Sequence, residues 1–488
     1  MHLATVVFVV AALFSCNKYL DVLPDNRTEL DTPEKMAQML VSAYPPQLPT
    51  RMQETMSDNM KDSGEEYGGD DEMYLFWDVS SIYQDSPYAV WVDCYHAVAA
   101  ANHVLAAAEE YKGPEDLSYI RGEALICRAF AHFVLANTFC QAYNPQTSTV
   151  DLGIPYCTEP ETTVHVDYKR GTVAQVYAAI EADIEAAWPL IDDTYYQQPT
   201  YHFTRRATAA FAAQFYLYYG KYEKSLEYSD FVLGEDPVTA FRNWDLVGGT
   251  SFKEITNTFN SSEESANLLN IGFNSWFGRS MSDRCCMTND IVNETLSSPG
   301  PWGSRLHNYN RVWGWGNRGF AFPKRAEYFV VTNQTAGTGH GFIVVCYYTV
   351  EKTLLDRAEA LTHLKRYDEA AKNLCWFYQQ GKGDNYNLSA EQISAWYETA
   401  SDKYRKPLAP RFHLEAGMQT NLIHAVLHAR RIGAMHDGNR LEDIKRYGIS
   451  YSHPVDKNPA IHIEPYDKRL AIQIPDAVSA AGIERNPR

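Results

Sequence analysis

Aromatic and planar polar side chains gather in residues 276–322, where Gly and Pro interrupt every helical pattern. A sugar is bound by flat apolar rings that cover its C–H faces and by planar groups that reach its hydroxyls. The stretch supplies both kinds of side chain. The candidate glycan-binding residues within it are Trp313, Trp315, Trp302, Trp276, Tyr309, Arg311, Asn317 and Arg318.

Trp313 and Trp315 are the leading candidates of this set. They stand two residues apart, so both rings face the same way in an extended segment, and Gly314 and Gly316 leave the backbone open to close approach. Two rings on one side can follow successive sugar units. For each ring the alternative is structural packing. A second aromatic group precedes the first long helical pattern, and Trp77 joins the candidates from there.

Several stretches resemble catalytic motifs, but none has the neighbouring elements or residues that such a motif requires. Residues 314–319 match GxGxxG, but no strand pattern precedes them and no helix pattern follows, so they do not indicate a dinucleotide site. Residues 278–282 lack the last glycine of a nucleophile elbow. Carboxylate pairs are too numerous in so acidic a chain to identify a glycosidase acid and nucleophile. We expect no catalytic residues, no cofactor and no enzymatic activity, and a hydrolase is a distant alternative.

Two patterns bear on metal binding. His424 and His428 stand four apart on a helical pattern, yet Ala425 occupies the place of the glutamate that a zinc protease requires. Histidines with satisfied hydrogen bonds are therefore favoured over zinc ligands. The acidic run at residues 70–72 has the ligand type for calcium, but a solvated acidic loop is the favoured interpretation. We expect no metal site.

Helical patterns surround this stretch, and two segments share the spacing of a helical pair. In residues 209–233 and 353–376, a small residue is followed nine positions later by a tyrosine and three after that by a small residue. This spacing predicts tetratricopeptide-like pairs, with small residues where two helices touch and a ring at the turn. Plain helical hairpins are the alternative. The positions are Ala213, Tyr222 and Ser225 in one copy and Ala358, Tyr367 and Ala370 in the other.

Helical periodicity also divides the chain. It predicts a helical part at about 87–236 and 349–448, with Thr172 and Thr204 as N-caps. Between them, residues 237–348 lose this periodicity and carry strand-like runs at 268–273 and 342–348. We therefore predict a mainly α fold of tetratricopeptide-like helical repeats with an irregular, loop-rich insertion carrying short strands. Such an insertion is where a binding surface is expected, and a polar segment, 449–488, closes the chain.

The chain opens with an apolar run, residues 3–14, that is too short to span a bilayer and is followed by Ser15 and Cys16. A small residue before a cysteine is typical of lipoprotein signals. We therefore predict residues 1–15 as the signal peptide and Cys16 as the lipidation site. The run lacks the usual preceding Lys or Arg, and an ordinary secretory signal is the alternative. Both readings predict export.

Charge and composition agree with an exported globular protein. The 43 basic and 61 acidic residues give a net charge of −18, which disfavours nucleic acid and anionic membrane surfaces as partners. With 488 residues and 45% hydrophobic content the chain can bury a large core. Arg121, Glu123 and Arg128 interrupt an apolar helical pattern, so we expect part of this charge to be paired inside the fold. Most of the cysteines are expected to be buried as small apolar residues.

Several motifs, taken in chain order from Cys16 to the last residue, resemble the SusD/RagB family. One departure lies in the helical pattern before the motif that begins at Asp437, where the family usually has acidic residues and this chain has Ala429 and Gly433. The motifs are Cys16-Asn17-Lys18-Tyr19-Leu20-Asp21, Arg121-Gly122-Glu123-Ala124 with Arg128-Ala129, Leu152-Gly153-Ile154-Pro155-Tyr156, Arg357-Ala358-Glu359-Ala360, Asp437-Gly438-Asn439-Arg440-Leu441-Glu442-Asp443-Ile444-Lys445-Arg446-Tyr447-Gly448, and Leu470-Ala471-Ile472-Gln473-Ile474-Pro475 with Asn486-Pro487.

Members of this family are outer-membrane lipoproteins of Bacteroidota that bind glycans as lids on a SusC-like TonB-dependent transporter. The resemblance implies that residues 16–488 form a non-catalytic, surface-exposed glycan-binding lipoprotein. Its expected partners are an oligo- or polysaccharide, a SusC-like transporter and the outer membrane through the lipid anchor, with no nucleic acid. The alternative is a tetratricopeptide-type interaction scaffold or peptide-binding lipoprotein. An empty, charged concave surface on the repeats would favour that alternative, and an aromatic platform in the insertion favours sugar.

Overall fold

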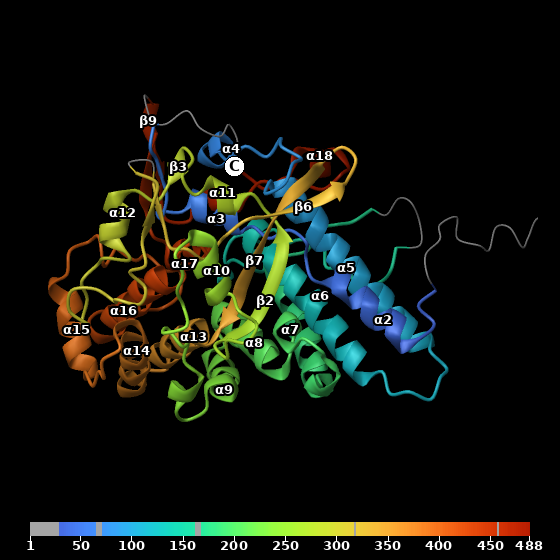
Figure 1. The fold of residues 1–488 in the computed structure, drawn as a ribbon, viewed down its shortest axis with the longest axis horizontal. Coiled ribbons are helices and arrows are strands. Elements are labelled where there is room, and N and C mark those ends of the chain that lie inside the picture. Colours follow the sequence, from blue (N-terminus) through green and yellow to red (C-terminus); the bar gives the residue numbers. More distant parts are fainter. Residues whose placement is uncertain (1–28, 65–70, 162–166, 317–318, 456–457) are drawn as a thin grey trace, which may run out of the picture.

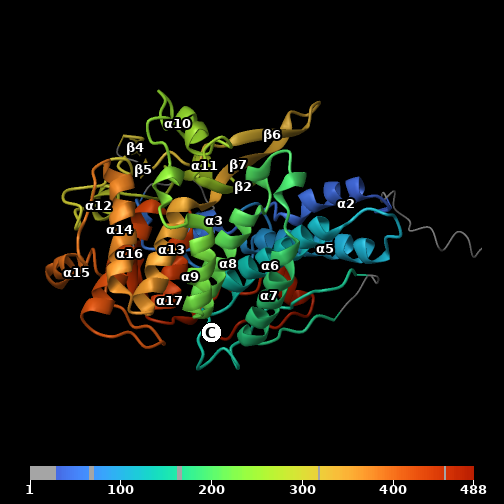
Figure 2. The same cartoon turned by 90° about the horizontal axis from the view of Figure 1, so that it is seen from below.

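The computed structural model describes residues 29–64, 71–161, 167–316, 319–455 and 458–488 (Figure 1). The predicted signal peptide and Cys16 lie outside these residues. In the part of the chain that is described, no helix combines the length and apolarity needed to cross a bilayer. The predicted fold class is confirmed, because long helices form most of the molecule and short strands cover one side of them (Figure 2).

The long helices form a row in which each packs on its neighbours. α5 contacts α6, α6 contacts α7, α8 contacts α9, α9 contacts α13, and α13 and α14 both contact α16, which also packs on α15. Figure 2 shows this row running across the molecule. The helices are α5 (Pro87–Glu110), α6 (Ser118–Phe139), α7 (Val173–Ala187), α8 (Arg205–Tyr219), α9 (Tyr222–Leu233), α13 (Val350–His363), α14 (Tyr367–Lys382), α15 (Ala390–Thr399) and α16 (Met418–Gly433).

Shorter helices and 3-10 turns cap the ends of this row and connect its members. Thr172 and Thr204 are the N-caps of α7 and α8, as predicted, and their hydroxyls accept the backbone N–H groups of Gln175 and Ala207. The shorter elements are α2 (Pro33–Leu40), η1 (Val41–Ala43), α3 (Thr50–Met56), α4 (Asp71–Leu75), η2 (Trp188–Leu190), η3 (Asp193–Tyr195), η4 (Pro199–Tyr201), η5 (Pro237–Ala240), α10 (Phe252–Phe259), α11 (Phe277–Ser280), α12 (Asn289–Glu294), α17 (Asn439–Tyr447), η6 (Lys468–Leu470) and α18 (Asp476–Ala480).

The two helical pairs predicted from residue spacing are α8 with α9 and α13 with α14. They lie side by side, because α9 packs on α13 although residues 234–349 separate the two helices. The small residues meet as expected: the Ser225 hydroxyl donates to the Ala213 carbonyl at 2.8 Å. At the turn of the first pair, the Tyr222 ring stacks on His363 of α13 with centroids 4.2 Å apart. The ring at the turn thus joins one pair to the next.

The insertion between these pairs is built on a three-stranded antiparallel sheet. β2 (Asn267–Asn274) pairs with β7 (Thr338–Thr349), and β7 pairs with β6 (Tyr328–Asn333). The strand-like runs predicted at 268–273 and 342–348 are this central pair. β6 is the edge strand, and Phe329, Val330 and Val331 on it are exposed. The two-stranded pairs are β1 (Lys61–Asp62) with β3 (Cys285–Cys286), β4 (Trp313–Gly314) with β5 (Phe320–Ala321), and β8 (Tyr451–Val455) with β9 (Asn458–Ile463).

Buried charges connect the helices, as the sequence predicts for Glu123 and Arg128. The Arg128 guanidinium makes two hydrogen bonds to Asp183 of α7, at 2.8 and 2.6 Å. Glu123 accepts hydrogen bonds from Tyr44 at 2.8 Å and from His202 at 2.7 Å. Arg121, in contrast, is exposed. The buried charges of Arg128 and Glu123 therefore attach α6 to α7 and to the segments that carry Tyr44 and His202.

α17 carries the largest share of this buried charge. Its Arg440 donates to both carboxylate oxygens of Asp58, at 2.7 and 2.9 Å, and its Arg446 binds Glu359 of α13. Lys445 donates to the carbonyls at the end of α6. Glu442 accepts from Tyr218 of α8 at 2.8 Å. One short helix thereby contacts three others, and the segment after α3, through polar side chains.

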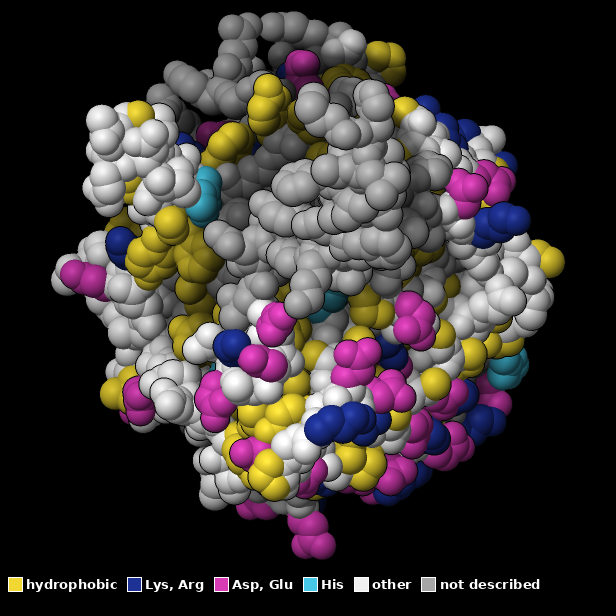
Figure 3. All heavy atoms as spheres, turned by 90° about the vertical axis from the view of Figure 1, so that its right-hand side faces the viewer, with side chains coloured by type: hydrophobic (Ala, Val, Ile, Leu, Met, Phe, Trp, Pro, Cys, Tyr) yellow, Lys and Arg dark blue, Asp and Glu magenta, His cyan; other side chains and the backbone are white. Residues whose placement is uncertain are grey.

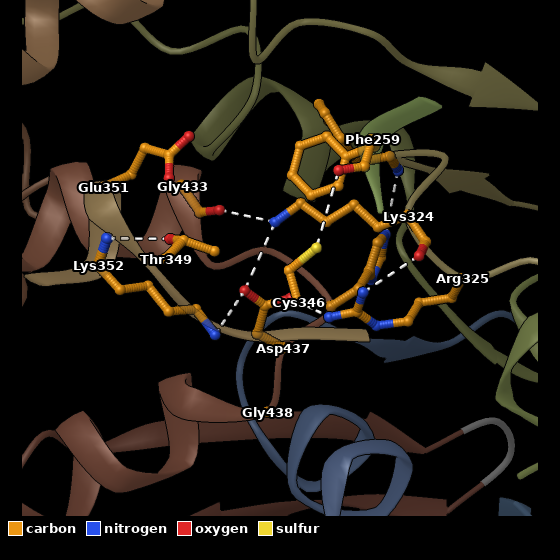
Figure 4. A network of polar contacts seen from close by, with 12 residues as sticks. Phe259, Lys324, Arg325, Cys346, Thr349, Glu351, Lys352, Gly433, Asp437 and Gly438 are labelled. Atoms are coloured by element: carbon orange, nitrogen blue, oxygen red, sulfur yellow. Dashed lines mark hydrogen bonds and ion pairs between the residues drawn. The ribbon is translucent and has the colours of Figure 1, made fainter. Parts of the chain in front are cut away.

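Asp437, just before α17, receives three cations. Lys324 and Lys352 lie 3.5 and 3.1 Å from its carboxylate and Arg325 donates to it (Figure 4). Burial opposes ionisation of this carboxyl, but the nearby Lys324, Lys352 and Arg325 hold its pKa well below the usual range. Lys324 and Arg325 belong to the insertion. The insertion is therefore attached to the helical part by a buried ionic contact.

Replacing Asp58 tests how much the fold depends on this buried charge. Burial opposes its ionisation, yet Arg431, Arg440 and Lys406 hold the pKa of Asp58 well below its usual range. Asp58→Ala leaves these cations buried without their carboxylate, so we expect the free energy of unfolding to fall by about 3–5 kcal/mol. Denaturant titration measures the change. Asp31→Ala, at an exposed pair with Lys35, is the control and should leave stability nearly unchanged. Equal effects of the two substitutions would contradict the prediction.

Candidate functional site

Trp313 and Trp315 lie on a small hairpin at the surface of the insertion. Trp313 pairs with Ala321 in the β4–β5 ladder, and the Trp315 N–H donates to the Gly319 carbonyl at 3.1 Å. The hairpin is attached to the body through the Phe320 N–H, which donates to the Met287 carbonyl at 2.9 Å. Both tryptophans are partly exposed. The pair of rings is therefore carried by hydrogen-bonded backbone.

Phe252 of α10 contacts both of these rings. Its centroid lies 6.1 Å from that of Trp313, edge to face, and 5.5 Å from that of Trp315. Both tryptophan rings therefore lie on the α10 side of the hairpin. Gly314 and Gly316 are exposed, so the backbone between and after the rings is open. The result is a surface of three aromatic rings, here called the hairpin platform: Phe252, Trp313 and Trp315.

Trp302 and Tyr309 are not on the surface. Each is 2% exposed. The Trp302 ring packs on Tyr378 of α14 and on His428 of α16, and the Tyr309 ring stacks on Phe377 with centroids 5.2 Å apart. The prediction that these two rings contact ligand is corrected by this burial. The spacing of Gly and Pro in the sequence predicts a loop, but it does not predict whether other segments cover that loop. In the structure, α14 and α16 cover it.

The remaining candidates are divided between structural and accessible positions. Trp77 is buried, with the Arg469 guanidinium 5.5 Å from its ring centroid, so it too is a packing residue. Arg311 donates to the carbonyls of Val247 and Trp244, at 2.5 and 3.1 Å, and so fixes a loop of the insertion. Trp276 is partly exposed. Asn317 and Arg318 lie outside the described residues.

A loop that the sequence ranks below the tryptophans presents the most exposed ring. In residues 76–85, here called the Tyr83 loop, Tyr83 is 71% and Phe76 is 51% exposed. The loop lies beside Trp276, because the Asp85 carboxylate accepts the Trp276 N–H at 2.8 Å and Gln84 donates to the Gly341 carbonyl at 2.7 Å. In the aromatic group around Trp77, the exposed rings are thus Tyr83 and Phe76, and Trp77 itself is buried.

The Tyr83 loop is held at both ends by strained backbone. Trp77 has φ 52° and Asp85 has φ 63°, left-handed values that non-glycine residues rarely adopt. Buried hydrogen bonds stabilise the second of these residues, since Tyr74 donates to its carbonyl at 3.0 Å and Arg51 lies 3.7 Å from its carboxylate. Strain of this kind is concentrated at binding sites. The exposed rings are therefore presented by an ordered loop.

The helical histidine pair is structural. His428 is buried, and its ring nitrogens contact the hydroxyls of Ser298 at 2.9 Å and Tyr397 at 3.0 Å. At His428 this confirms a histidine with satisfied hydrogen bonds, and His424 is buried as well. The solvated-loop interpretation of the acidic run is wrong at Asp71, which is buried and accepts hydrogen bonds from Arg51 and from the Cys285 N–H. Within the described residues no cluster of His, Cys, Asp or Glu could hold a metal ion.

Comparison with known proteins identifies a family model and solved structures to which this chain is similar. Residues 18–217 match the SusD-like family model described as starch-binding and associating with the outer membrane. The chain matches no curated protein. Among solved structures, a putative sugar-binding protein from Bacteroides vulgatus is similar at 17% identity, over 94% of this chain and 99% of that one, with a TM-score of 0.64. A SusD superfamily protein from Bacteroides thetaiotaomicron is similar at 16% identity, over 93% and 98%, with a TM-score of 0.63.

The buried histidines generate a prediction about acid stability. Burial, followed by the charges of Arg431 and Arg440, lowers the pKa of His428 from 6.5 to about 3. Below about pH 6.5 His428 binds a proton in the unfolded chain but not in the folded chain. Its contribution to the free energy of unfolding is therefore fully present above that pH and is lost as the pH falls toward 3. We expect His428 alone to reduce the free energy of unfolding by about 2 kcal/mol between about pH 6.5 and 5.

Thermal unfolding between these pH values measures the effect. His428→Gln keeps a hydrogen-bonding side chain without the titration, so its unfolding midpoint should fall less on acidification than that of the unmodified protein. His413→Gln is the control substitution, because the His413 side chain is 84% exposed. A His428→Gln variant as acid-sensitive as the unmodified protein would count against the assignment.

Proposed function

We propose that this protein, which is SusD-like over residues 18–217 and has the SusD fold over nearly its whole length, is a carbohydrate-binding protein of the outer membrane. The observation that carries the proposal is the hairpin platform. Both tryptophan rings are partly exposed, although Trp315 also packs against the core, and their exposed faces suit the C–H faces of a sugar. The family model's description and the sugar-binding name of a similar structure support the same ligand class.

The ligand surface extends over one side of the helical row. Figure 2 shows β4, β5, α10, α11 and β6 together on that side. The hairpin platform and Trp276, which directly precedes α11, both belong to it, and the Tyr83 loop is attached beside Trp276. Several rings on one side suit an extended polysaccharide better than a single sugar. Trp313 and Trp315 are the principal contacts in this proposal.

Binding without catalysis is the role that the charges favour. Asp58, Asp437 and Glu359, whose pKa values are strongly lowered, are buried and paired with Lys and Arg side chains. Their lowered pKa suits neither a general acid nor a contact with ligand. The proposed protein captures its glycan and does not cleave it.

Peptide binding by the helical row is the less favoured function. The interior face of the row is charged, as that alternative requires, but it is not empty. Arg430, Glu359 and Tyr218 on this face are bound by Asp443, Arg446 and Glu442 of α17. α17 therefore occupies the position along these helices where a peptide would lie.

Membrane attachment and delivery complete the proposal. The signal preceding Cys16 supports a lipid anchor on the cell surface. A binding protein held by lipid cannot carry its ligand across the membrane, so a SusC-like TonB-dependent transporter is the proposed receiver. The resemblance to SusD-like proteins supports this partner.

Calorimetry on the two tryptophans tests the carbohydrate site. A ring that stacks on a ligand contributes about 1–3 kcal/mol, so Trp313→Ala or Trp315→Ala should weaken binding by about ten- to a hundredfold. The ligand is chosen from a polysaccharide panel that includes starch. Trp376→Ala, a partly exposed tryptophan on α14, is the matched control.

The outcomes separate binding from packing. Selective loss of affinity with unchanged thermal stability supports the hairpin platform. Normal binding by both folded variants would place the site elsewhere, and loss of stability in both would show that the rings are packing residues.

Cell fractionation tests the anchor. Cys16→Ala removes the thiol that would be acylated, and several acyl chains hold a protein to a bilayer far more firmly than one. We expect the variant to fold, to bind glycan and to leave the membrane fraction almost completely. Cys375→Ala, which replaces a buried cysteine, is the control and should remain with membranes. Membrane retention of the Cys16 variant would contradict lipid anchoring.

A further inference from the structure

A separate groove of about 600 Å³ opens between α2, η1, α5, η4 and β2. It is distant from the hairpin platform: Figure 2 places β4 and β5 toward the left of the helical row and α2 and α5 at the right. Figure 3 views the molecule from the side on which α2 and α5 lie. Hydrophobic side chains gather at the left of this face, and Asp and Glu side chains are frequent in its lower part. The groove volume is within the range of small-molecule sites.

One face of α5 lines the groove. His96 and His103 each stand three and four residues from the adjacent Ala99 and Ala100, and all four residues line it. Residues at this spacing share a helix face. One imidazole therefore stands at each end of a pair of alanines, and the small alanine side chains leave room above the surface of the helix.

The opposite walls carry tyrosine rings and a third imidazole. Tyr201 is 40% exposed, and Tyr44 and His202 line the groove with it. Tyr44 and His202 are both fixed by buried Glu123, at 2.8 and 2.7 Å, and the His202 ring stacks on Tyr196 with centroids 4.5 Å apart. Side chains held in this way lose little entropy when a ligand binds. The groove is therefore preorganised.

Charge restricts the ligand. Among the described residues, none that lines the groove is Asp, Glu, Lys or Arg, although the chain has a net charge of −18. A charged ligand would lose its hydration there without gaining an opposite charge. The polar side chains on its walls are imidazoles, phenols, an amide and a hydroxyl, all of which pair with neutral hydroxyl groups. The Tyr44 hydroxyl is already bonded to Glu123 and to the Phe203 N–H, so the other groups are the ones that can meet a ligand. The lining suits an uncharged ligand with apolar faces and several hydroxyls.

We propose that this groove is a second carbohydrate site, which takes a neutral oligosaccharide of about two or three units. The inference rests on the proposed function and adds to it a site for short chains, distinct from the hairpin platform. Tyr201 covers a sugar face, and His96, His103 and His202 exchange hydrogen bonds with its hydroxyls. The alanines of α5 allow the sugar ring to approach the helix.

Chemical modification of histidine tests the groove directly. Diethylpyrocarbonate acylates accessible imidazoles in the intact mature protein, and mass spectrometry of peptides digested from the labelled protein reports each site. His96 and His413 are a matched pair, because their side chains are 72% and 84% exposed and each lies within 4 Å of a carboxylate. Maltotriose, cellotriose and mannotriose are the neutral probes. A trisaccharide at about ten times its Kd should slow modification of His96 about tenfold and leave His413 unchanged.

Variants locate the protection. Ala99→Trp fills the groove and Tyr201→Ala removes its exposed ring, so both should abolish protection of His96 at the same trisaccharide concentration. Tyr195→Ala is the control for the second change, since Tyr195 is exposed on the neighbouring η3 turn and does not line the groove. Trp313→Ala should preserve the protection.

The outcomes separate this inference from the proposed function. If polysaccharide binds at the hairpin platform but none of the trisaccharides protects His96, the groove proposal is overturned and the proposed function stands. Protection that persists in folded Ala99→Trp and Tyr201→Ala variants also overturns it. If no carbohydrate binds the protein at all, both fall together.

Discussion

The pairing of buried charge around α17 is the interaction on which the rest of the structure depends. A charge that leaves water loses several kcal/mol of hydration and regains it only from a well-placed partner. α17 sets Arg440 against Asp58 next to α3, Arg446 against Glu359 of α13, and Asp443 against Arg430 of α16. Moving any of these helices would leave several charges unpaired together. The helical row therefore has one favoured arrangement, specified by polar contacts as much as by its apolar core.

This constraint also positions the candidate binding surface. Asp437 receives Lys324 and Arg325 from the insertion and Lys352 from α13 (Figure 4). The base of the insertion is thus fixed at the same ionic centre as the helices. Beyond that base, the β4–β5 hairpin contacts α10 through Phe252 and remains at the surface. The rings that suit a sugar are accordingly carried by short elements on a rigid support.

Local patterns in the sequence predicted the elements well, because caps and helical spacing act over a few residues. Thr172, Thr204 and the Ser225 contact with Ala213 are examples. The candidate site was predicted less well, because exposure is decided by distant segments. Trp302 lies in a Gly-rich loop, yet α14 and α16 bury it. No feature within that loop distinguishes it from the exposed hairpin that carries Trp313.

The same limit applies to the Tyr83 loop. Its aromatic composition is visible in the sequence, but Trp77 is buried under Arg469 while Tyr83 is exposed. The left-handed backbone at Trp77 and Asp85, at the two ends of this loop, is likewise a feature that composition does not encode. The groove lined by α2, α5 and β2 joins residues far apart in the chain, and helical periodicity alone assigns Ala99 and Ala100 only to a face of α5.

The direct contact between α9 and α13 makes the intervening chain a closed loop with adjoining ends. The entropic cost of closing a flexible loop rises slowly with length, by about 0.6 kcal/mol for each doubling. Segments between the attachment points of the insertion can therefore lengthen or shorten during evolution at small cost to the helices. The architecture separates a slowly changing scaffold from a binding region that is free to diversify, so related scaffolds can acquire different ligands by exchange of surface segments.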